Sequence, residues 1–283
     1  MRIDLHAHTT ASDGTDSPTQ LVENAAQAGL DVVAITDHDS TAGWGEAEQA
    51  AERVGIELVR GIEVSCQTGG ISVHVLGYLH DPSDDRLQRE LDLARESRDT
   101  RARRIVELLA QDVEIEWDDV LAQVAADATI GRPHIADALV ARGVVSDRDA
   151  AFRDYLYTGS RYYASHYAVD PVEAVRLIRA AGGVAVMAHP FAAKRGRIVS
   201  DQVISDMADA GLLALEAHHL DHTPEQTAKG VGLAAELGLL VTGSSDYHGT
   251  GKVNRLGDRL TDADVFGAIA EAASATSVVR PRG

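Results

Sequence analysis

The sequence predicts an α/β protein in which parallel strands alternate with helices, arranged as an open sheet or as a barrel. Three observations support this fold class. Short apolar runs recur along most of the chain, helices with clear start and stop signals separate them, and polar residues follow nearly every run. Alternation at this spacing is typical of parallel β/α units. With 283 residues, of which 45% are hydrophobic, the chain is long enough to bury a large core.

The N-terminal part contains four expected strands, at residues 3–5, 32–35, 58–64 and 73–78. Ser17-Pro18-Thr19-Gln20 combines an N-cap, a first-turn proline and a capping-box glutamine, so a helix begins there and ends at Gly29. A second helix, at about residues 41–53, closes at Gly55 before the third strand. This order of elements predicts two consecutive β/α units.

The same pattern returns in the C-terminal part of the chain. Asp170-Pro171-Val172-Glu173 repeats the capping chemistry, and the helix that begins there ends at Gly182-Gly183. Strands are expected at residues 184–187, 212–215, 239–242 and 277–279. Thr223-Pro224-Glu225-Gln226 begins another capped helix. The main domain is therefore expected to be built from two separated parts of the chain.

The intervening residues 83–165 do not alternate in this way. Helical patterns are expected at residues 83–110, 117–126, 133–141 and 147–156, and the first is long and highly charged. We therefore predict three segments: residues 1–82 form the first part of the main domain, 83–165 a mostly helical insertion, and 166–283 the second part.

Composition excludes several classes of protein. A net charge of −18 argues against coating long nucleic acid, although it does not exclude a local anion site. No apolar run approaches the roughly 20 residues of a membrane helix, and the N-terminus lacks the features of a secretory signal. Cys66, the single cysteine, excludes an internal disulfide framework and a thiolate-clustered metal site. We therefore expect a cytoplasmic protein without a membrane partner.

Histidines and acids gather where the expected strands end. These residues are His6, His8, Asp13, His38, Glu63, His74, His189, Glu216, His218, His219, Asp246 and His248. The carboxyl ends of parallel strands converge in a barrel or an open sheet. Residues two apart in extended chain point to the same side, so His6 and His8 are able to aim inward together. The set favours a metal site of imidazole and carboxylate ligands, which suits Zn, Mn or Fe.

Each of these residues also has a structural interpretation. A single histidine at a strand end is more often a hydrogen-bonded core or rim residue than a ligand. Asp13 is compatible with a plain turn, and for Asp37 and Asp39, which flank His38, we favour structural roles such as helix caps. Only the whole set, at matching positions in successive units, favours metal binding.

The motifs His6-Ala7-His8-Thr9, Ser12-Asp13-Gly14, Thr36-Asp37-His38, Gly61-Ile62-Glu63, Ala188-His189-Pro190 and Ser245-Asp246-Tyr247-His248, with His74, resemble those of the polymerase and histidinol phosphatase (PHP) family of metallohydrolases. The resemblance implies a distorted (β/α)7 TIM-like barrel and three divalent ions of Mn, Fe or Zn. It also implies how the ligands are shared. One ion would take His6, His8, Glu63 and Asp246, a second would share Glu63 and add His74 and His189, and a third would take Asp13, His38 and His248.

Within this family the insertion resembles that of a subgroup acting on small nucleotides. The segments that carry this resemblance are Ile130-Gly131-Arg132-Pro133-His134-Ile135-Ala136 and Ala181-Gly182-Gly183-Val184-Ala185. The resemblance makes the insertion a substrate cap in which Arg132 and His134 hold a phosphate. The alternative is that Gly131-Arg132-Pro133 only opens a helix. Arg197 is a further candidate for a phosphate or for a solvated loop, and His222 is a candidate general acid.

The expected reaction is hydrolysis of a phosphoester. Clustered divalent ions lower the pKa of bound water and thereby supply hydroxide near neutral pH. Expected substrates are nucleoside 3′,5′-bisphosphates, AMP-type nucleotides or the 5′ ends of short RNA. The alternatives are a phosphatase for histidinol phosphate or another non-nucleotide monoester, a related amidohydrolase, and a non-catalytic metal-binding module. An amidohydrolase often needs a carboxylated lysine, and none of Lys194, Lys229 and Lys252 follows a strand suitably. The sequence does not indicate an oligomeric state.

Overall fold

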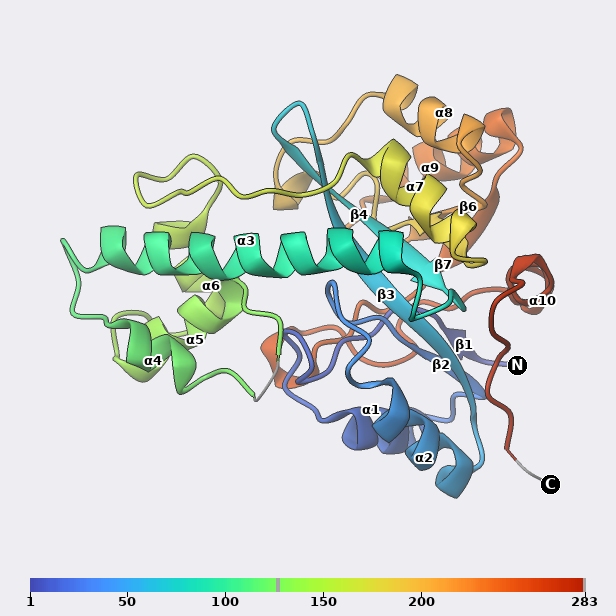
Figure 1. The fold of residues 1–283 in the computed structure, drawn as a ribbon, viewed down its shortest axis with the longest axis horizontal. Helices are drawn as coiled ribbons and strands as arrows, with labels where there is room; N and C mark the ends of the chain where they lie inside the picture. The colour runs from blue at the N-terminus through green and yellow to red at the C-terminus, as the bar shows by residue number, and fades with distance from the viewer. Residues whose placement is uncertain (126–127, 282–283) are drawn as a thin grey trace.

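A seven-stranded sheet rolled into a nearly closed barrel forms the centre of the computed structural model, which describes residues 1–125 and 128–281 (Figure 1). The strands lie side by side in sequence order. They are β1 (Ile3–Asp4), β2 (Val32–Ile35), β3 (Glu57–Thr68), β4 (Ile71–Tyr78), β5 (Val184–Met187), β6 (Ala214–His218) and β7 (Leu240–Gly243). The predicted barrel class is confirmed. Strands that are consecutive in the sequence are also adjacent in the sheet.

The sheet is mixed, so the prediction of parallel strands throughout is wrong at β4. The pairs β1–β2, β2–β3, β5–β6 and β6–β7 are parallel, whereas β4 is antiparallel to both β3 and β5. The cause is the two-residue turn Gly69-Gly70, whose φ angles are 55° and 72°. Such a turn returns the chain as a hairpin and leaves no room for a crossover helix. β3 therefore continues past its predicted end to Thr68.

Contacts between the first and last strands close the barrel. Ala7 and Tyr247 form a parallel bridge, in which the amide of His8 donates to the carbonyl of Tyr247 over 2.8 Å. The amide of Ser245 donates to Oδ1 of Asp4 over 3.0 Å. Because the loops after β1 and β7 are joined in this way, the residues that follow these two strands are held side by side.

The two faces of the sheet belong to two separate cores. Val32 and Ala34 pack inside the barrel, whereas Val33 and Ile35 pack outward against helices, as the period of two requires. The helices around the barrel are α1 (Pro18–Gln27), α2 (Trp44–Val54), α7 (Pro171–Ala180), α8 (Asp201–Asp209), α9 (Pro224–Leu237) and α10 (Ala263–Ala272). Short 3₁₀ turns at Ala193–Arg195 and Gly249–Gly251 follow β5 and β7.

The predicted helix caps form as expected. At the start of α1 the hydroxyl of Ser17 accepts from the amide of Gln20 over 3.2 Å, and the Gln20 side chain accepts from the amide of Ser17 over 2.8 Å. Thr223 and Gln226 repeat this capping box at the start of α9. Each box pairs two amides that a helix N-terminus otherwise leaves unpaired.

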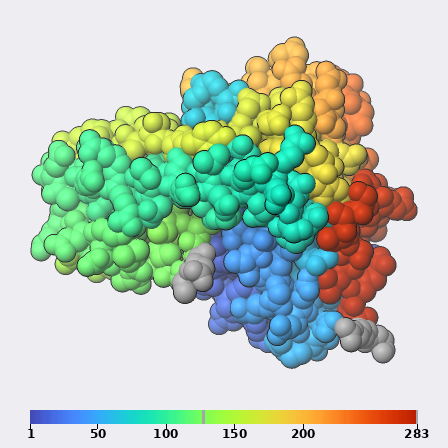
Figure 2. Space-filling view, in the orientation of Figure 1, coloured from blue at the N-terminus to red at the C-terminus, as the bar shows by residue number. Residues whose placement is uncertain are grey.

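The insertion is helical, as predicted, and forms a lobe beside the barrel (Figure 2). Its elements are α3 (Asp85–Leu109), α4 (Trp117–Leu121), α5 (Arg132–Ala141), α6 (Arg148–Ala151) and a π-helical turn (Phe152–Leu156). The lobe has its own core, to which α3 contributes Ala102 and Ile105, while Leu87 and Leu91 at the other end of α3 belong to the barrel core. The long helix therefore connects the two parts (Figure 1).

Two predicted elements differ from the structure. The helix expected at residues 117–126 ends at Leu121, and Ala126 lies outside the described residues. Residues 277–279 form no strand; Val279 makes a single antiparallel bridge to Leu58, because only one residue of this tail lies beside the sheet. Among the helices in the described part of the chain, none is both long and apolar enough to cross a membrane.

His80, which follows β4, provides a test of the core outside the functional site. Its ring is fully buried against Trp44, with 5.0 Å between ring centroids. Burial lowers its pKa from 6.5 to about 4. The unfolded chain therefore binds a proton that the folded chain excludes, so stability falls as the pH falls from 6.5 towards 4. Lowering the pH from 7.5 to 5 should reduce the free energy of unfolding of the wild type. The reduction should be about 2 kcal/mol smaller in His80→Leu, which lacks the buried imidazole. Urea unfolding at both pH values measures this difference, and equal losses would contradict a neutral buried imidazole.

Candidate metal centre

Two histidines that follow β1 lie at the centre of a buried cluster at one end of the barrel. The Nε2 atoms of His6 and His8 are 3.1 Å apart, and they lie 3.2 and 3.0 Å from Oε2 of Glu63. Oδ1 of Asp246, after β7, lies 3.5 Å from His6 and 3.4 Å from His8. Two imidazole nitrogens and two carboxylate oxygens thus face one point, as the ligands of a metal ion do.

Glu63 joins this group to two more histidines. Its other oxygen, Oε1, lies 2.7 Å from Nδ1 of His74, in β4, and 3.1 Å from Nε2 of His189, which follows β5. The antiparallel hairpin brings His74 to this position, because it pairs His74 with Ser65 two residues beyond Glu63. One carboxylate therefore faces two neighbouring groups of nitrogen atoms, the arrangement of a ligand that bridges two ions.

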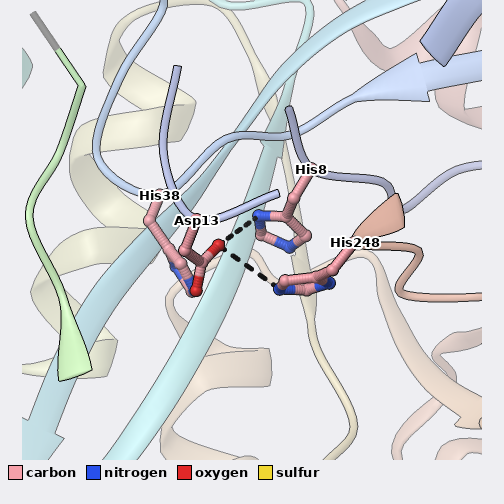
Figure 3. Close-up of side chains that lie close together, drawn as sticks. All are labelled: His8, Asp13, His38 and His248. Atoms are coloured by element: carbon pink, nitrogen blue, oxygen red, sulfur yellow. Dashed lines mark ion pairs between the residues drawn. The ribbon is translucent and has the colours of Figure 1, made fainter. Parts of the chain in front are cut away.

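A third group surrounds Asp13, in the turn that follows the first strand (Figure 3). Its Oδ1 lies 3.3 Å from Nε2 of His248 and 3.6 Å from Nδ1 of His8. Its Oδ2 lies 3.7 Å from Nε2 of His38, which follows β2. Figure 3 shows the carboxylate between the His38 ring on one side and the His8 and His248 rings on the other. This group shares His8 with the first.

The protonation states of the three carboxylates and of two histidines suit metal ligands. Burial would lower the pKa values of His6 and His8, but the surrounding carboxylates raise that of His8 to about 9 and that of His6 well above its usual range, so a bound cation would displace a proton from each ring. Burial would raise the pKa values of Asp13, Glu63 and Asp246, but the surrounding histidine and basic side chains hold all three well below their usual range. Burial lowers the pKa of His189 to about 3 and that of His248 to about 4. At neutral pH the three carboxylates are therefore ionised and these two imidazoles neutral, as divalent metal ions require.

All nine predicted ligands thus meet at one end of the barrel. Three sets have ligand atoms close enough to hold an ion: His6, His8, Glu63 and Asp246; His8, Asp13, His38 and His248; and His38, Glu63 and His74. The first is the set that the family resemblance implies. In the other two His38 is shared, and its buried Nδ1 has no hydrogen-bond partner among the described residues. The donor atoms present fit a cluster of divalent ions.

Two of the nine residues adopt strained backbone conformations. His189 has a φ angle of 29° and Asp246 one of 51°, in the left-handed region that favours glycine. A non-glycine residue there costs on the order of 1–2 kcal/mol, and such residues concentrate at functional sites. These turns direct both side chains from the strand ends into the cluster.

Carboxylates beside the cluster hold its loops in place. Asp37 accepts from the amide and hydroxyl of Thr9, over 2.8 and 2.7 Å, and from the hydroxyl of Ser12 over 2.6 Å. Asp39 accepts from the amide and hydroxyl of Ser65, each over 2.7 Å. Both aspartates have structural roles, as predicted, but Asp37 connects two loops, Asp39 connects its loop to β3, and neither caps a helix.

Glu216 supports the cluster from β6, inside the strand that was expected to end before it. Its Oε1 accepts from Nδ1 of His6, and its Oε2 accepts from the amide of His189, each over 2.9 Å. Burial would raise its pKa, but pairing with His6 lowers it to about 2. A carboxylate on the far nitrogen of a ligating histidine orients that ring and increases its basicity.

The predicted phosphate-binding residues occupy different surroundings. Arg132 begins α5, where its guanidinium donates to the carbonyl of Leu156 over 2.9 Å. The Nδ1 atom of His134 accepts from the amide of Gly131 over 3.1 Å, so the neutral ring carries its proton on Nε2. Arg197 donates to the carbonyls of Gly69 and Gly70 at the tip of the β3–β4 hairpin, each over 3.2 Å. The phosphate-binding role of each remains a prediction.

Of the histidines after β6, His219 rather than His222 presents a nitrogen to the cluster. Nε2 of His222 accepts from the amide of Phe191 over 3.1 Å, and its Nδ1 donates to the carbonyl of Ala217 over 2.9 Å. The predicted role of His222 as general acid would require breaking one of these bonds. His219 accepts from the amide of Asp221 at Nδ1, and its buried Nε2 lies 3.4 Å from Oδ2 of Asp246 without a hydrogen bond.

Two basic residues that the sequence did not single out contact the cluster. Arg195 pairs with both Asp221 and Asp246, and Lys252 lies 2.8 Å from Oδ2 of Asp246. Arg195 belongs to the basic segment Lys194-Arg195-Gly196-Arg197, in which only Arg197 was a candidate from the sequence. Which of its arginines faces the cluster depends on the turn after β5.

Comparisons with known proteins agree with this geometry. The profile of the PHP domain matches residues 4–146. The chain is 36% identical to a 3′,5′-nucleoside bisphosphate phosphatase of Chromobacterium violaceum, over 89% of each protein. It is 35% identical to a 5′-3′ exoribonuclease of Haemophilus influenzae, over 87% of this chain and 90% of that one. A solved structure from Bifidobacterium adolescentis, named as a metal-dependent phosphoesterase, superimposes with a TM-score of 0.94, 44% identity and 96% coverage of both chains.

Sequence, fold and ligand geometry therefore lead to one assignment. The matched domain contains Glu63 and the loops after β1 and β2, and the full-length similarity extends to the loops after β5 and β7. The chain belongs to the PHP family of metal-dependent phosphoesterases.

Proposed function

We propose that this enzyme hydrolyses phosphate esters of small nucleotides, with nucleoside 3′,5′-bisphosphates, AMP-type nucleotides and the 5′ ends of short RNA as candidate substrates. The observation that supports this proposal best is the position of the insertion. Arg148 of α6 donates to the carbonyl of Asp13 over 3.4 Å, and the amide of Thr129 donates to the carbonyl of Ala11 over 3.2 Å, so the insertion contacts the loop that carries Asp13. Relatives with related full-length sequences are named for nucleotide and RNA substrates.

The nine residues His6, His8, Asp13, His38, Glu63, His74, His189, Asp246 and His248 would hold three divalent ions of Mn, Fe or Zn. When bound, such ions activate water and offset the charge of a phosphoryl group. Hydrolysis adds one water across the phosphoester bond: its oxygen joins phosphorus, the bond to the nucleoside oxygen breaks, and that oxygen gains a proton. His219 offers an Nε2–H to a phosphate or a leaving oxygen, because its Nδ1 accepts from the amide of Asp221. We propose that residues 83–165 act as the substrate cap, with Arg132 binding a phosphate oxygen.

Arg197 is a weaker candidate than Arg132 for binding a substrate phosphate in this proposal. Its guanidinium already donates to two carbonyls at the hairpin tip. Only a substrate long enough to reach the hairpin tip, such as a short RNA, would contact Arg197. Activity that depends on Arg197 for RNA but not for mononucleotides would support that use.

Phosphate release from a substrate panel tests the function. The panel contains nucleoside 3′,5′-bisphosphates, AMP, short 5′-phosphorylated RNA, histidinol phosphate and a sugar phosphate, each with added Mn²⁺. We expect kcat/KM for at least one nucleotide substrate to exceed that for the sugar phosphate by about ten- to a hundredfold, since a second specific charged contact is worth about 1.5–3 kcal/mol. Preference for histidinol phosphate or the sugar phosphate would contradict the proposal.

A further inference from the structure

The insertion contacts the loop after β1 and the turn after β7, which carry two ligands of the third group of the metal centre. These ligands are Asp13 and His248 (Figure 3). In the loop after β1, the carbonyl of Ala11 accepts from the amide of Thr129 over 3.2 Å, and the carbonyl of Asp13 accepts from Nη1 of Arg148 over 3.4 Å. The insertion therefore holds the backbone of this loop at two places and leaves the carboxylate of Asp13 directed at the histidines.

Asp137 fixes the side chain of Arg148 in place. Arg148 is the first residue of α6, and Asp137 lies on the neighbouring helix α5. Nε and Nη2 of Arg148 donate to the two carboxylate oxygens of Asp137, each over 2.5 Å. Two parallel bonds of this kind fix the orientation of a guanidinium as well as its position. Only 15% of the Arg148 side chain is exposed, and the bidentate pair leaves Nη1 directed at the barrel.

The same guanidinium lies against the turn that follows His248. A Cβ atom at Gly251 would overlap Nη1 of Arg148, so the side chain packs on the bare backbone of the 3₁₀ turn Gly249–Gly251. The amide of Gly251 donates to the carbonyl of His248 over 3.3 Å, which ties the turn to that ligand. A larger residue at position 251 would therefore displace the guanidinium from the turn.

Thr15 joins the two loops at this point. Its amide donates to the carbonyl of His248 over 3.2 Å, and its hydroxyl accepts from the amide of Thr250 over 2.8 Å. Arg148 therefore contacts two chain segments that are already bonded to each other. Both segments belong to one metal group, because Oδ1 of Asp13 lies 3.3 Å from Nε2 of His248. A displacement of Arg148 would loosen both ligands together.

The barrel itself supports ligands of the other two ions. Glu216 of β6 holds both the ring of His6 and the amide of His189. Glu63 and His74 lie on β3 and β4, whose pairing fixes them relative to each other. The contacts of Arg148 act instead on the position of the third ion, which would take Asp13, His38 and His248.

Pairing with Asp137 also suits Arg148 to a place beside cations. An unpaired guanidinium at this distance from Asp13 would repel a divalent ion bound there. The carboxylate of Asp137 offsets that charge. Arg148 therefore contributes hydrogen bonding and packing to the two loops without adding net charge next to the metal centre.

We propose that Arg148 is a positioning residue, through which the insertion holds the loops of Asp13 and His248 and completes the site of the third ion. This proposal rests on the proposed three-ion centre and deepens it, because it makes metal binding and docking of the insertion depend on each other. Such coupling is reciprocal, so the third ion stabilises the docked insertion as much as the docked insertion stabilises the ion. The third ion would thus also hold the proposed substrate cap against the barrel.

Counting metal ions tests the role of Arg148. Chelator-treated protein is titrated calorimetrically with Mn²⁺, and the bound metal is confirmed by elemental analysis. We expect the wild type to bind three ions and Arg148→Gln to bind one of them at least about tenfold more weakly, the usual effect of losing a residue behind a metal ligand. Gly251→Ala should reproduce this selective loss, because its methyl group would displace the guanidinium from the other side.

Arg153→Gln is the matched control for this substitution. Arg153 lies in the π-helical turn that follows α6, is 69% exposed and pairs with Asp154. We expect this variant to bind all three ions as the wild type does. Unchanged binding in Arg148→Gln, or equal weakening of all three ions, would overturn the proposal.

Hydrogen exchange measures the reciprocal effect without turnover. In the wild type, Mn²⁺ should slow amide exchange in residues 148–156 at least about fivefold, the lower end of typical coupling between two sites. In Arg148→Gln the same ions should slow this segment by less than about twofold, and equal slowing in the two proteins would overturn the coupling. A wild type that binds only two ions would overturn this inference and the three-ion centre but not nucleotide hydrolysis. A wild type that binds three ions and hydrolyses no nucleotide would overturn the proposed substrate class alone.

Discussion

Replacing Glu63 by Gln is expected to lower kcat at least about a thousandfold and to reduce the bound metal. Its two carboxylate oxygens face different groups of histidines, with Oε2 towards His6 and His8 and Oε1 towards His74 and His189. An amide keeps the shape but loses the charge, and its NH₂ group presents hydrogen atoms where a cation would bind. A loss of this size corresponds to about 4 kcal/mol, the scale of metal-ion catalysis. Phosphate release and elemental analysis of the same sample measure both effects.

Glu57→Gln provides the matched control for this substitution. Glu57 is the first residue of β3, the strand that contains Glu63. Its Oε1 lies 3.5 Å from Nε of Arg280, and it does not belong to the metal centre. We expect its activity and metal content to match those of the wild type. A Glu63→Gln enzyme with normal metal content and turnover would show that the carboxylate is not a ligand.

Glu216→Gln is expected to weaken metal binding about ten- to a hundredfold without preventing catalysis at saturation. Glu216 touches the cluster only through His6 and the amide of His189. Losing its charge lowers the basicity of the His6 ring and loosens the turn after β5, an effect of the usual size for a residue behind a metal ligand. The midpoint of activity in a Mn²⁺ titration measures this change.

Excess metal separates the two substitutions. Activity of Glu216→Gln should return towards the wild-type value at high Mn²⁺. Activity of Glu63→Gln should not return, because this substitution removes a carboxylate oxygen that would contact the ion directly. If excess Mn²⁺ left Glu216→Gln inactive, Glu216 would have to act directly on the substrate.

The barrel was predictable because its local signals agree with its packing. Capping boxes at Ser17 and Thr223 mark the starts of helices that later cover the sheet. The direction of β4 was not predictable from apolar pattern, which is the same for parallel and antiparallel strands. Two adjacent glycines, Gly69 and Gly70, form the hairpin turn that makes β4 antiparallel. The separate core of the lobe arises from contacts along α3, and hydrophobic periodicity alone does not show which core a residue of α3 joins.

The convergence of the nine expected ligands at one end of the barrel was predictable because strand ends converge and because the family motifs are specific. The contacts of Arg98, Arg195 and His219 were not, since the directions of these side chains depend on tertiary contacts. Arg98 belongs to a highly charged helix whose sequence is typical of a solvent-exposed helix. Its side chain is nevertheless only 13% exposed and pairs with Asp39. His219 resembled a rim histidine in sequence, but it is buried with one nitrogen unpaired.

Metal dependence of nucleotide hydrolysis tests the central claim most directly. The wild-type protein is stripped with chelator, dialysed and titrated with Mn²⁺, while bound metal and phosphate release from a nucleoside 3′,5′-bisphosphate are followed together. We predict that the stripped enzyme is inactive and that activity returns as ions fill the cluster, up to three per chain. Undiminished hydrolysis by protein shown to contain no metal would contradict a metal-dependent phosphoesterase.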